Sequence, residues 1–142
     1  MALAADTPVA ARAANILNLP IGSGVTVFAG SLVGLLTTTG RAVLWSDVAN
    51  LEHLGHALEG GTGDAGGTVR VSIEAGDRIL EKVSVTGVTA ETDVGTMVHA
   101  TDDNTFTLTP GASAPAVGRV IKFHTGTTVD VLIPGTAALA DA

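Results

Sequence analysis

Thr68-Val69-Arg70-Val71-Ser72-Ile73-Glu74 is the stretch that decides the fold, because polar and apolar side chains alternate along its whole length. Successive side chains of an extended strand point to opposite faces, so the two valines and the isoleucine share one face. The same alternation occurs over residues 105–109 and 128–133. A slip of one residue would turn each apolar face toward water, so the pattern specifies the register of these strands.

Short β-branched stretches of this kind recur along the chain between turn residues. They predict strands over residues 25–28, 32–37, 41–45, 68–73, 79–85, 96–100, 105–109, 119–123 and 128–133. Strands at such regular spacing are typical of an all-β sandwich or barrel. Thr101-Asp102-Asp103-Asn104 predicts a hairpin between two of them, because Asp and Asn tolerate left-handed backbone and bond to their own turns.

Two segments depart from the strand pattern. Within residues 47–58 the apolar side chains recur at spacings of three and four, and Ser46 or Asp47 is placed to cap the start, which predicts one short helix. Residues 60–67 are almost entirely glycine, alanine and short polar residues, which predicts a mobile loop. The expected fold is therefore a small β-sandwich or barrel with an N-terminal extended arm and one short helix.

The N-terminal 20 residues are alanine-rich and show no alternation. We expect residues 1–20 to form an arm, residues 21–135 to form the β domain, and residues 136–142 to form a C-terminal tail. Apolar side chains at the end of the arm need cover, which a neighbouring chain would supply. The candidate binding residues of the arm are Ile16, Leu17, Leu19, Pro20 and Ile21. The alternative is that the arm packs on its own domain as one more strand.

Composition excludes several classes of protein. The 142 residues include 7 Lys and Arg against 14 Asp and Glu, a net charge of −7, and the basic residues are scattered, so we expect no nucleic-acid binding. The absence of cysteine excludes disulfides, thiolate metal sites and cysteine nucleophiles. Without an uninterrupted apolar run of about 20 residues we expect no membrane span. The start lacks the basic and leucine-rich regions of a signal peptide, so we expect a soluble protein without an export signal.

Candidate chemistry is sparse. On a helix, His53 and His56 would lie close enough to bind a metal together with Glu52 or Glu59, but two solvent-facing histidines are the simpler interpretation. The pair Asp102-Asp103 lacks the spaced ligands of a calcium loop. No serine lies in a Gly-x-Ser-x-Gly elbow, and the glycine-rich segment lacks the lysine of a phosphate-binding loop. We expect no enzyme, no cofactor and no metal site.

Two glycine-led motifs carry a resemblance to a known family. Val27-Phe28-Ala29-Gly30 is followed by Leu32-Val33-Gly34, and Pro115-Ala116-Val117-Gly118-Arg119-Val120 precedes a closing strand that ends Ile133-Pro134-Gly135. Over about residues 20–135 the chain resembles the head decoration proteins, or capsid cement proteins, of tailed bacteriophages. Residues 47–58 and 60–67 match no part of that pattern.

The resemblance implies a compact β domain with an N-terminal arm that assembles as a homotrimer at three-fold positions and locks adjacent major capsid subunits without catalysis. Residues 1–20 would then contact the major capsid protein, and residues 114–119 would help to shape the domain. We expect a structural virion protein on the outer capsid surface, present in the host cytoplasm during assembly, whose many weak contacts add up over the shell. The alternative is a particle-displayed adhesion or glycan-binding module, for which Trp45 would supply the stacking surface.

Overall fold

The computed structural model describes residues 15–113 and 116–135, and it confirms the all-β class. The strands are β1 (Ile16–Pro20), β2 (Thr26–Val27), β3 (Leu32–Leu36), β4 (Arg41–Leu44), β5 (Leu51–Ala57), β6 (Gly61–Thr62), β7 (Arg70–Glu74), β8 (Arg78–Thr86), β9 (Met97–Ala100), β10 (Phe106–Thr107), β11 (Gly118–Thr125) and β12 (Thr128–Ile133). A single 3₁₀ turn, η1 (Glu91–Asp93), is the helical element within the described ranges.

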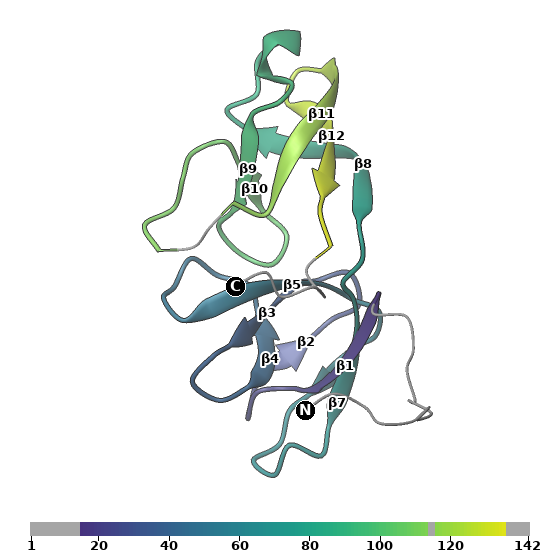
Figure 1. Cartoon of the computed structure of the whole chain (residues 1–142), viewed down its shortest axis with the longest axis vertical. Helices are drawn as coiled ribbons and strands as arrows, with labels where there is room; N and C mark the ends of the chain where they lie inside the picture. The colour runs from purple at the N-terminus through teal and green to yellow at the C-terminus, as the bar shows by residue number, and fades with distance from the viewer. Residues whose placement is uncertain (1–14, 114–115, 136–142) are drawn as a thin grey trace, which may run out of the picture.

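The strands form two lobes stacked on one another (Figure 1). The sheet lobe is a five-stranded sheet in the order β1-β7-β5-β3-β4, and the barrel lobe is a closed barrel in the order β10-β8-β12-β11-β9. The short strands β2 and β6 pair beside the sheet lobe. The chain passes from one lobe to the other where β7 continues into β8, and we call the region between the lobes the waist.

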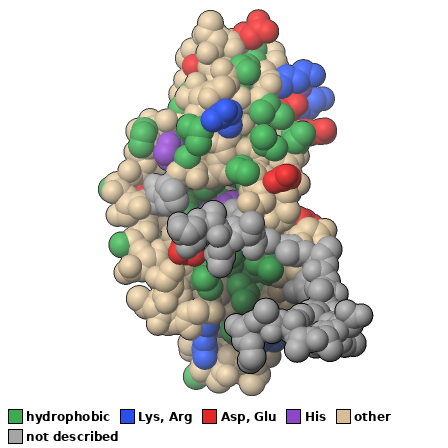
Figure 2. Space-filling view, in the orientation of Figure 1, with side chains coloured by type: hydrophobic (Ala, Val, Ile, Leu, Met, Phe, Trp, Pro, Cys, Tyr) green, Lys and Arg blue, Asp and Glu red, His purple; other side chains and the backbone are tan. Residues whose placement is uncertain are grey.

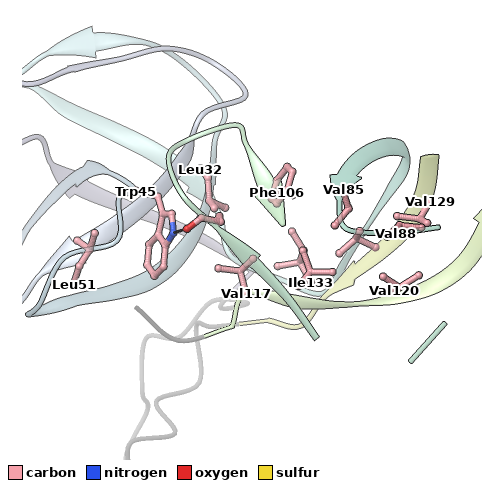
Figure 3. Close-up of a cluster of buried hydrophobic side chains, with 13 residues drawn as sticks. Leu32, Trp45, Leu51, Val85, Val88, Phe106, Val117, Val120, Val129 and Ile133 are labelled. Atoms are coloured by element: carbon pink, nitrogen blue, oxygen red, sulfur yellow. Dashed lines mark hydrogen bonds between the residues drawn. The ribbon is translucent and has the colours of Figure 1, made fainter. Parts of the chain in front are cut away.

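A shared hydrophobic core joins the two lobes. Side chains inside the barrel lobe, such as Val85 and Val129, pack in the same cluster as Leu32, Trp45 and Leu51 of the sheet lobe (Figure 3). The Trp45 indole Nε1 donates a hydrogen bond of 2.9 Å to the backbone oxygen of Ala100 on β9. A second cluster fills the sheet lobe itself. The indole therefore ties the lobes together by both apolar contact and a buried hydrogen bond.

The nine strands expected from alternation are all present, and so is the expected hairpin. Between β9 and β10 the Asp102 carboxylate accepts hydrogen bonds from the backbone N–H groups of Asn104 and Thr105, at 2.9 and 2.8 Å. The Thr101 N–H donates to the Thr105 carbonyl at 3.0 Å and closes the turn. Asp102 therefore supplies the turn chemistry that the sequence indicates.

The expected helix over residues 47–58 is wrong, because this segment contains strand β5 (Leu51–Ala57). The register against β3 shifts between His53 and Gly55, so one extra residue bulges from the strand. Leu51 then packs in the hydrophobic core shared by the two lobes, and Leu54 packs in the core of the sheet lobe. A strand buried on both faces and interrupted by a bulge produces apolar spacings of three and four residues, which imitate a helix.

The expected loop over residues 60–67 also contains a strand, because β6 pairs with β2. The turn after it is organised by Asp64, whose carboxylate accepts hydrogen bonds from the hydroxyl and the backbone N–H of Thr68. Arg41 donates to the carbonyl oxygens of Asp64 and Ala65, each at 2.9 Å. Gly63 lies so close to the backbone of residues 21 and 22 that no side chain fits there. Glycine serves here for close backbone packing.

Candidate functional site

The arm residues predicted to bind a partner lie largely within the fold. Strand β1 pairs with β7 along its whole length, and Leu17 and Leu19 pack against the sheet-lobe core. Ile21 is fully buried and is a core residue with no surface for a partner, which corrects its assignment to a binding arm. Ile16 remains 39 % exposed. Packing as one more strand is therefore correct for Ile16–Pro20, whereas the earlier part of the arm lies outside the described residues.

A groove of about 490 Å³ lies at the waist, between residues of the two lobes. We call it the waist groove. Its walls are mostly apolar, and several polar side chains also line it. The apolar wall residues are Leu58, Leu80, Val83 and Phe106, and the polar ones are His56, Glu74, Arg78, Asp103 and Asn104. Mostly apolar walls with a few placed polar groups are typical of binding sites.

Strand pairing places the floor of the waist groove. Leu32 on β3 lies opposite His56 on β5, His56 lies opposite Glu74 on β7, and Glu74 lies opposite Ile16 on β1. Residues opposite one another on neighbouring strands share a face of the sheet. His56 and Glu74, the two middle residues of this row, line the groove, whereas Leu32 is buried and Ile16 is 39 % exposed.

Arg78, at the start of β8, is held by neighbours in the waist. Its Nε donates to His56 Nδ1 at 3.1 Å, and its Nη1 donates to the Gly76 carbonyl oxygen at 2.6 Å. Nη2 is buried and has no hydrogen-bond partner within the described residues. Burial lowers the pKa of Arg78, while the nearby carboxylates of Glu74 and Asp77 oppose that shift. Two of the three guanidinium nitrogens therefore already donate hydrogen bonds within the chain.

The two histidines of β5 are neutral at neutral pH. Burial, followed by the charge of Arg78, lowers the pKa of His56 to about 4. Burial, then Arg78 and then His56, lowers the pKa of His53 to about 3. The His53 ring also meets the Trp45 ring edge to face, with the centroids 5.6 Å apart. The expectation of two solvent-facing histidines is therefore wrong, because β5 turns both rings toward the waist.

Several polar groups of the waist groove are occupied by contacts within the chain. His56 Nδ1, the acceptor that a general base would use, is already bonded to Arg78. The side chains that line the groove include no hydroxyl, thiol or amine nucleophile. In residues 15–113 and 116–135, no group of three or more His, Cys, Asp or Glu side chains is arranged to hold a metal ion.

A second surface crosses the outside of the barrel lobe, and we call it the barrel-face row. Ile79 on β8 lies opposite Leu132 on β12, Leu132 lies opposite Arg119 on β11, and Arg119 lies opposite Met97 on β9. Ile79 is 55 % exposed and Met97 is 43 % exposed. A hollow of about 200 Å³ opens beside three of these residues. Figure 2 shows hydrophobic side chains next to basic ones over the barrel lobe.

Trp45 does not offer the stacking surface that a glycan site would need. The indole is 1 % exposed and donates a hydrogen bond to the backbone oxygen of Ala100 in the core shared by the lobes. Phe28, in the turn before β3, is instead the exposed aromatic, at 66 %. It lines a second hollow that shares Gly30, Asp103 and Asn104 with the waist groove.

Comparison of the chain with protein-family models and with curated proteins gives no match. Among the helices of the described segments, none is long and apolar enough to cross a membrane. The surfaces described above are therefore the basis on which a function can be inferred. The barrel-face row and the waist groove were both missed by the sequence analysis, because each joins residues from distant strands. One usable indication was present: Ile79 and Leu132 occupy positions that the alternation of β8 and β12 directs outward.

Proposed function

We propose that this protein is a noncatalytic virion protein that binds the outer surface of a phage capsid and bridges its major capsid subunits as a homotrimer. The observation that carries the proposal is the barrel-face row. The row exposes an isoleucine on β8 and a methionine on β9, at its two ends, and a second protein seated on the row would remove both from water. The sequence resemblance to head decoration proteins supplies the identity of that second protein.

The architecture supports this role in two ways. The barrel lobe is closed, so its strands offer few free edges that could pair with other chains. A partner would therefore bind to the side chains on its outer face. The shared core around Trp45 joins the lobes, so a load applied to one lobe passes to the other through packed side chains. A capsid binder needs only modest affinity per copy, because contacts repeated around a trimer and over the shell act together.

Binding to stripped capsids tests the proposal. Capsids freed of small surface proteins are mixed with the full chain and sedimented, and we expect saturable binding. The double variant Ile79→Asp with Met97→Asp should lose most of it, because it places charge in the apolar interface. Val48→Asp is the matched control, since Val48 is 47 % exposed but lies in the sheet lobe outside the row. Equal binding by both variants, or none by the unmodified chain, would remove the basis of the proposal.

The trimer is tested separately by sedimentation equilibrium. We expect a species of three times the 14.1 kDa chain mass. Trimers form either in solution or on the capsid, so the measurement is made on the free protein and on protein released from decorated capsids. A monomer in both samples would refute the homotrimer and leave capsid binding to be judged on its own.

A further inference from the structure

The hollow of about 200 Å³ beside the barrel-face row combines apolar walls with a positive charge. We call this hollow the barrel pocket. Arg119 is the one charged residue among its described lining residues, and the apolar walls are formed by Met97, Ala116, Val117, Leu132 and Pro134. Pockets for drug-sized ligands measure about 300–1,000 Å³. The barrel pocket is smaller and therefore suits a single side chain.

Arg119 has hydrogen-bonding capacity that the rest of the described chain does not use. Arg41, Arg70 and Arg78 each donate two hydrogen bonds of 2.6–3.1 Å to oxygen or nitrogen acceptors. The exposed guanidinium of Arg119 instead contacts the Met97 sulfur, at 3.7 Å, and it forms no ion pair within residues 15–113 and 116–135. A thioether sulfur is a weak acceptor. Arg119 is therefore the described arginine best able to bind an acceptor on a partner.

The surroundings of Arg119 determine which acceptor it suits. A guanidinium binds a carboxylate through two parallel hydrogen bonds, which makes a carboxylate a stronger partner than a neutral oxygen. The residues opposite Arg119 on the neighbouring strands, Leu132 and Met97, are apolar. An apolar group that fills the pocket would displace water from beside the guanidinium, and opposite charges attract more strongly where water is excluded. The complementary group is therefore an apolar side chain with a carboxylate next to it.

Paired strands fix the walls of the barrel pocket. Gly118 lines the pocket and lies opposite Val98 on β9, and the Val117 N–H donates a hydrogen bond of 2.8 Å to the Val98 carbonyl oxygen. A Cβ added to Gly118 would lie 2.5 Å from the Leu132 carbonyl oxygen, so β11 approaches β12 closely at this point. A site on paired strands is preorganised, which reduces the entropy lost on binding.

We propose that the barrel pocket receives one apolar side chain of the major capsid protein, and that an aspartate or glutamate of the same capsid segment pairs with Arg119. The identity of this partner rests on the function proposed above. The pocket is continuous with the barrel-face row through Leu132, which lies opposite Ile79 on β8. A capsid segment seated in the pocket is thus placed to cover the exposed Ile79 side chain as well.

The chemistry of the pocket is tested on the full chain without a capsid. Isocaproate carries a branched apolar group and a carboxylate, and isocaproamide has the same shape without the charge. In an NMR titration we expect isocaproate to shift the amide signals of residues 97, 116–119 and 132, and isocaproamide to bind about tenfold more weakly. Arg119→Gln should reduce the affinity for isocaproate to that for the amide. Lys122→Gln is the matched control, because it removes the same charge from β11 outside the pocket and should change nothing.

Three results of the titration would overturn the proposal. They are equal binding of the two compounds, equal effects of the two variants, and the absence of saturable shifts at the pocket. Ala116→Leu tests the apolar part, because it fills some of the pocket and leaves Arg119 in place. It should weaken the binding of both compounds, and unchanged affinity would also refute the assignment.

Binding to stripped capsids tests the partner. Arg119→Glu should bind about tenfold more weakly than the unmodified chain, and Lys122→Glu, with the same charge change on the same strand, should bind within about twofold. Capsid binding that both variants retain equally would overturn the role of the pocket and leave capsid attachment standing. No binding by the unmodified chain would overturn capsid attachment, and with it the capsid as the source of the side chain, whatever the titration shows.

Discussion

Acid should destabilise this fold through His53, and the structure gives the size of the effect. The folded pKa of about 3 lies below the usual value of 6.5, so the unfolded chain binds the proton first as the pH falls. The stabilisation is complete above about pH 6.5 and is lost progressively toward pH 3. Between pH 7 and pH 5 the unfolded imidazole titrates over about 1.5 units, which at 1.36 kcal/mol per unit costs about 2 kcal/mol.

His53→Phe should remove this dependence. Phenylalanine keeps a ring against Trp45 and removes a buried Nε2 that has no hydrogen-bond partner in the described part of the chain. Urea unfolding of both proteins at pH 7 and pH 5 measures the difference. We expect the free energy of unfolding to fall by about 2 kcal/mol more in the unmodified chain than in the variant. His56 remains in both proteins and contributes in the same direction.

His124→Gln is the control for replacing a histidine. It lies on the barrel lobe beside Asp130 and leaves both histidines of β5 in place, so the acid sensitivity that arises from His53 should persist. Parallel pH dependences in the unmodified chain and in His53→Phe would refute the reasoning, because the buried ring would then carry no proton-linked stability.

Three further predictions test the fold. Gly63→Ala should lower the free energy of unfolding, measured in urea, by about 2 kcal/mol or more, because the added Cβ would overlap the Gly22 carbonyl oxygen. The control Gly66→Ala should be nearly neutral, because the nearest atom to its added Cβ is 3.8 Å away. Equal losses in the two variants would contradict the close backbone packing at Gly63. Trp45→Phe should lower the free energy of unfolding by about 2–4 kcal/mol, because the buried Ala100 carbonyl loses its hydrogen-bond donor and a cavity opens. An unchanged melting temperature would argue against the shared hydrophobic core that joins the lobes. Asp102→Ala should cost about 1 kcal/mol by chemical denaturation, and no loss would remove its role in the hairpin.

Alternation was sufficient to predict the strands that have one face in a core and one in water. In β7 and β12 the inward positions are apolar and match the buried residues of the structure. The same rule failed for β5, because Leu51 and Leu54 belong to different cores and a bulge lies between them. It also failed for β1, a five-residue strand that ends in proline and follows an alanine-rich stretch.

The surfaces that carry function could be predicted less well than the strands. The waist groove takes residues from β5, β7, β8 and β10, and the order of these strands in space is set by long-range pairing that local sequence does not record. His53 and His56 were noticed for their spacing, but their neutral state follows from burial and from Arg78, which is distant in sequence. The barrel-face row was indicated only by apolar residues at outward positions.

Attachment to the outside of a phage capsid can be tested by a cryo-electron microscopy reconstruction of stripped capsids incubated with the full chain. If the proposal is right, we expect added density at the three-fold positions of the outer surface, into which three copies of the two-lobed fold can be placed with the Ile79 and Met97 side of the barrel lobe against the shell. A reconstruction at saturating protein that shows no ordered density on the outer surface would contradict it.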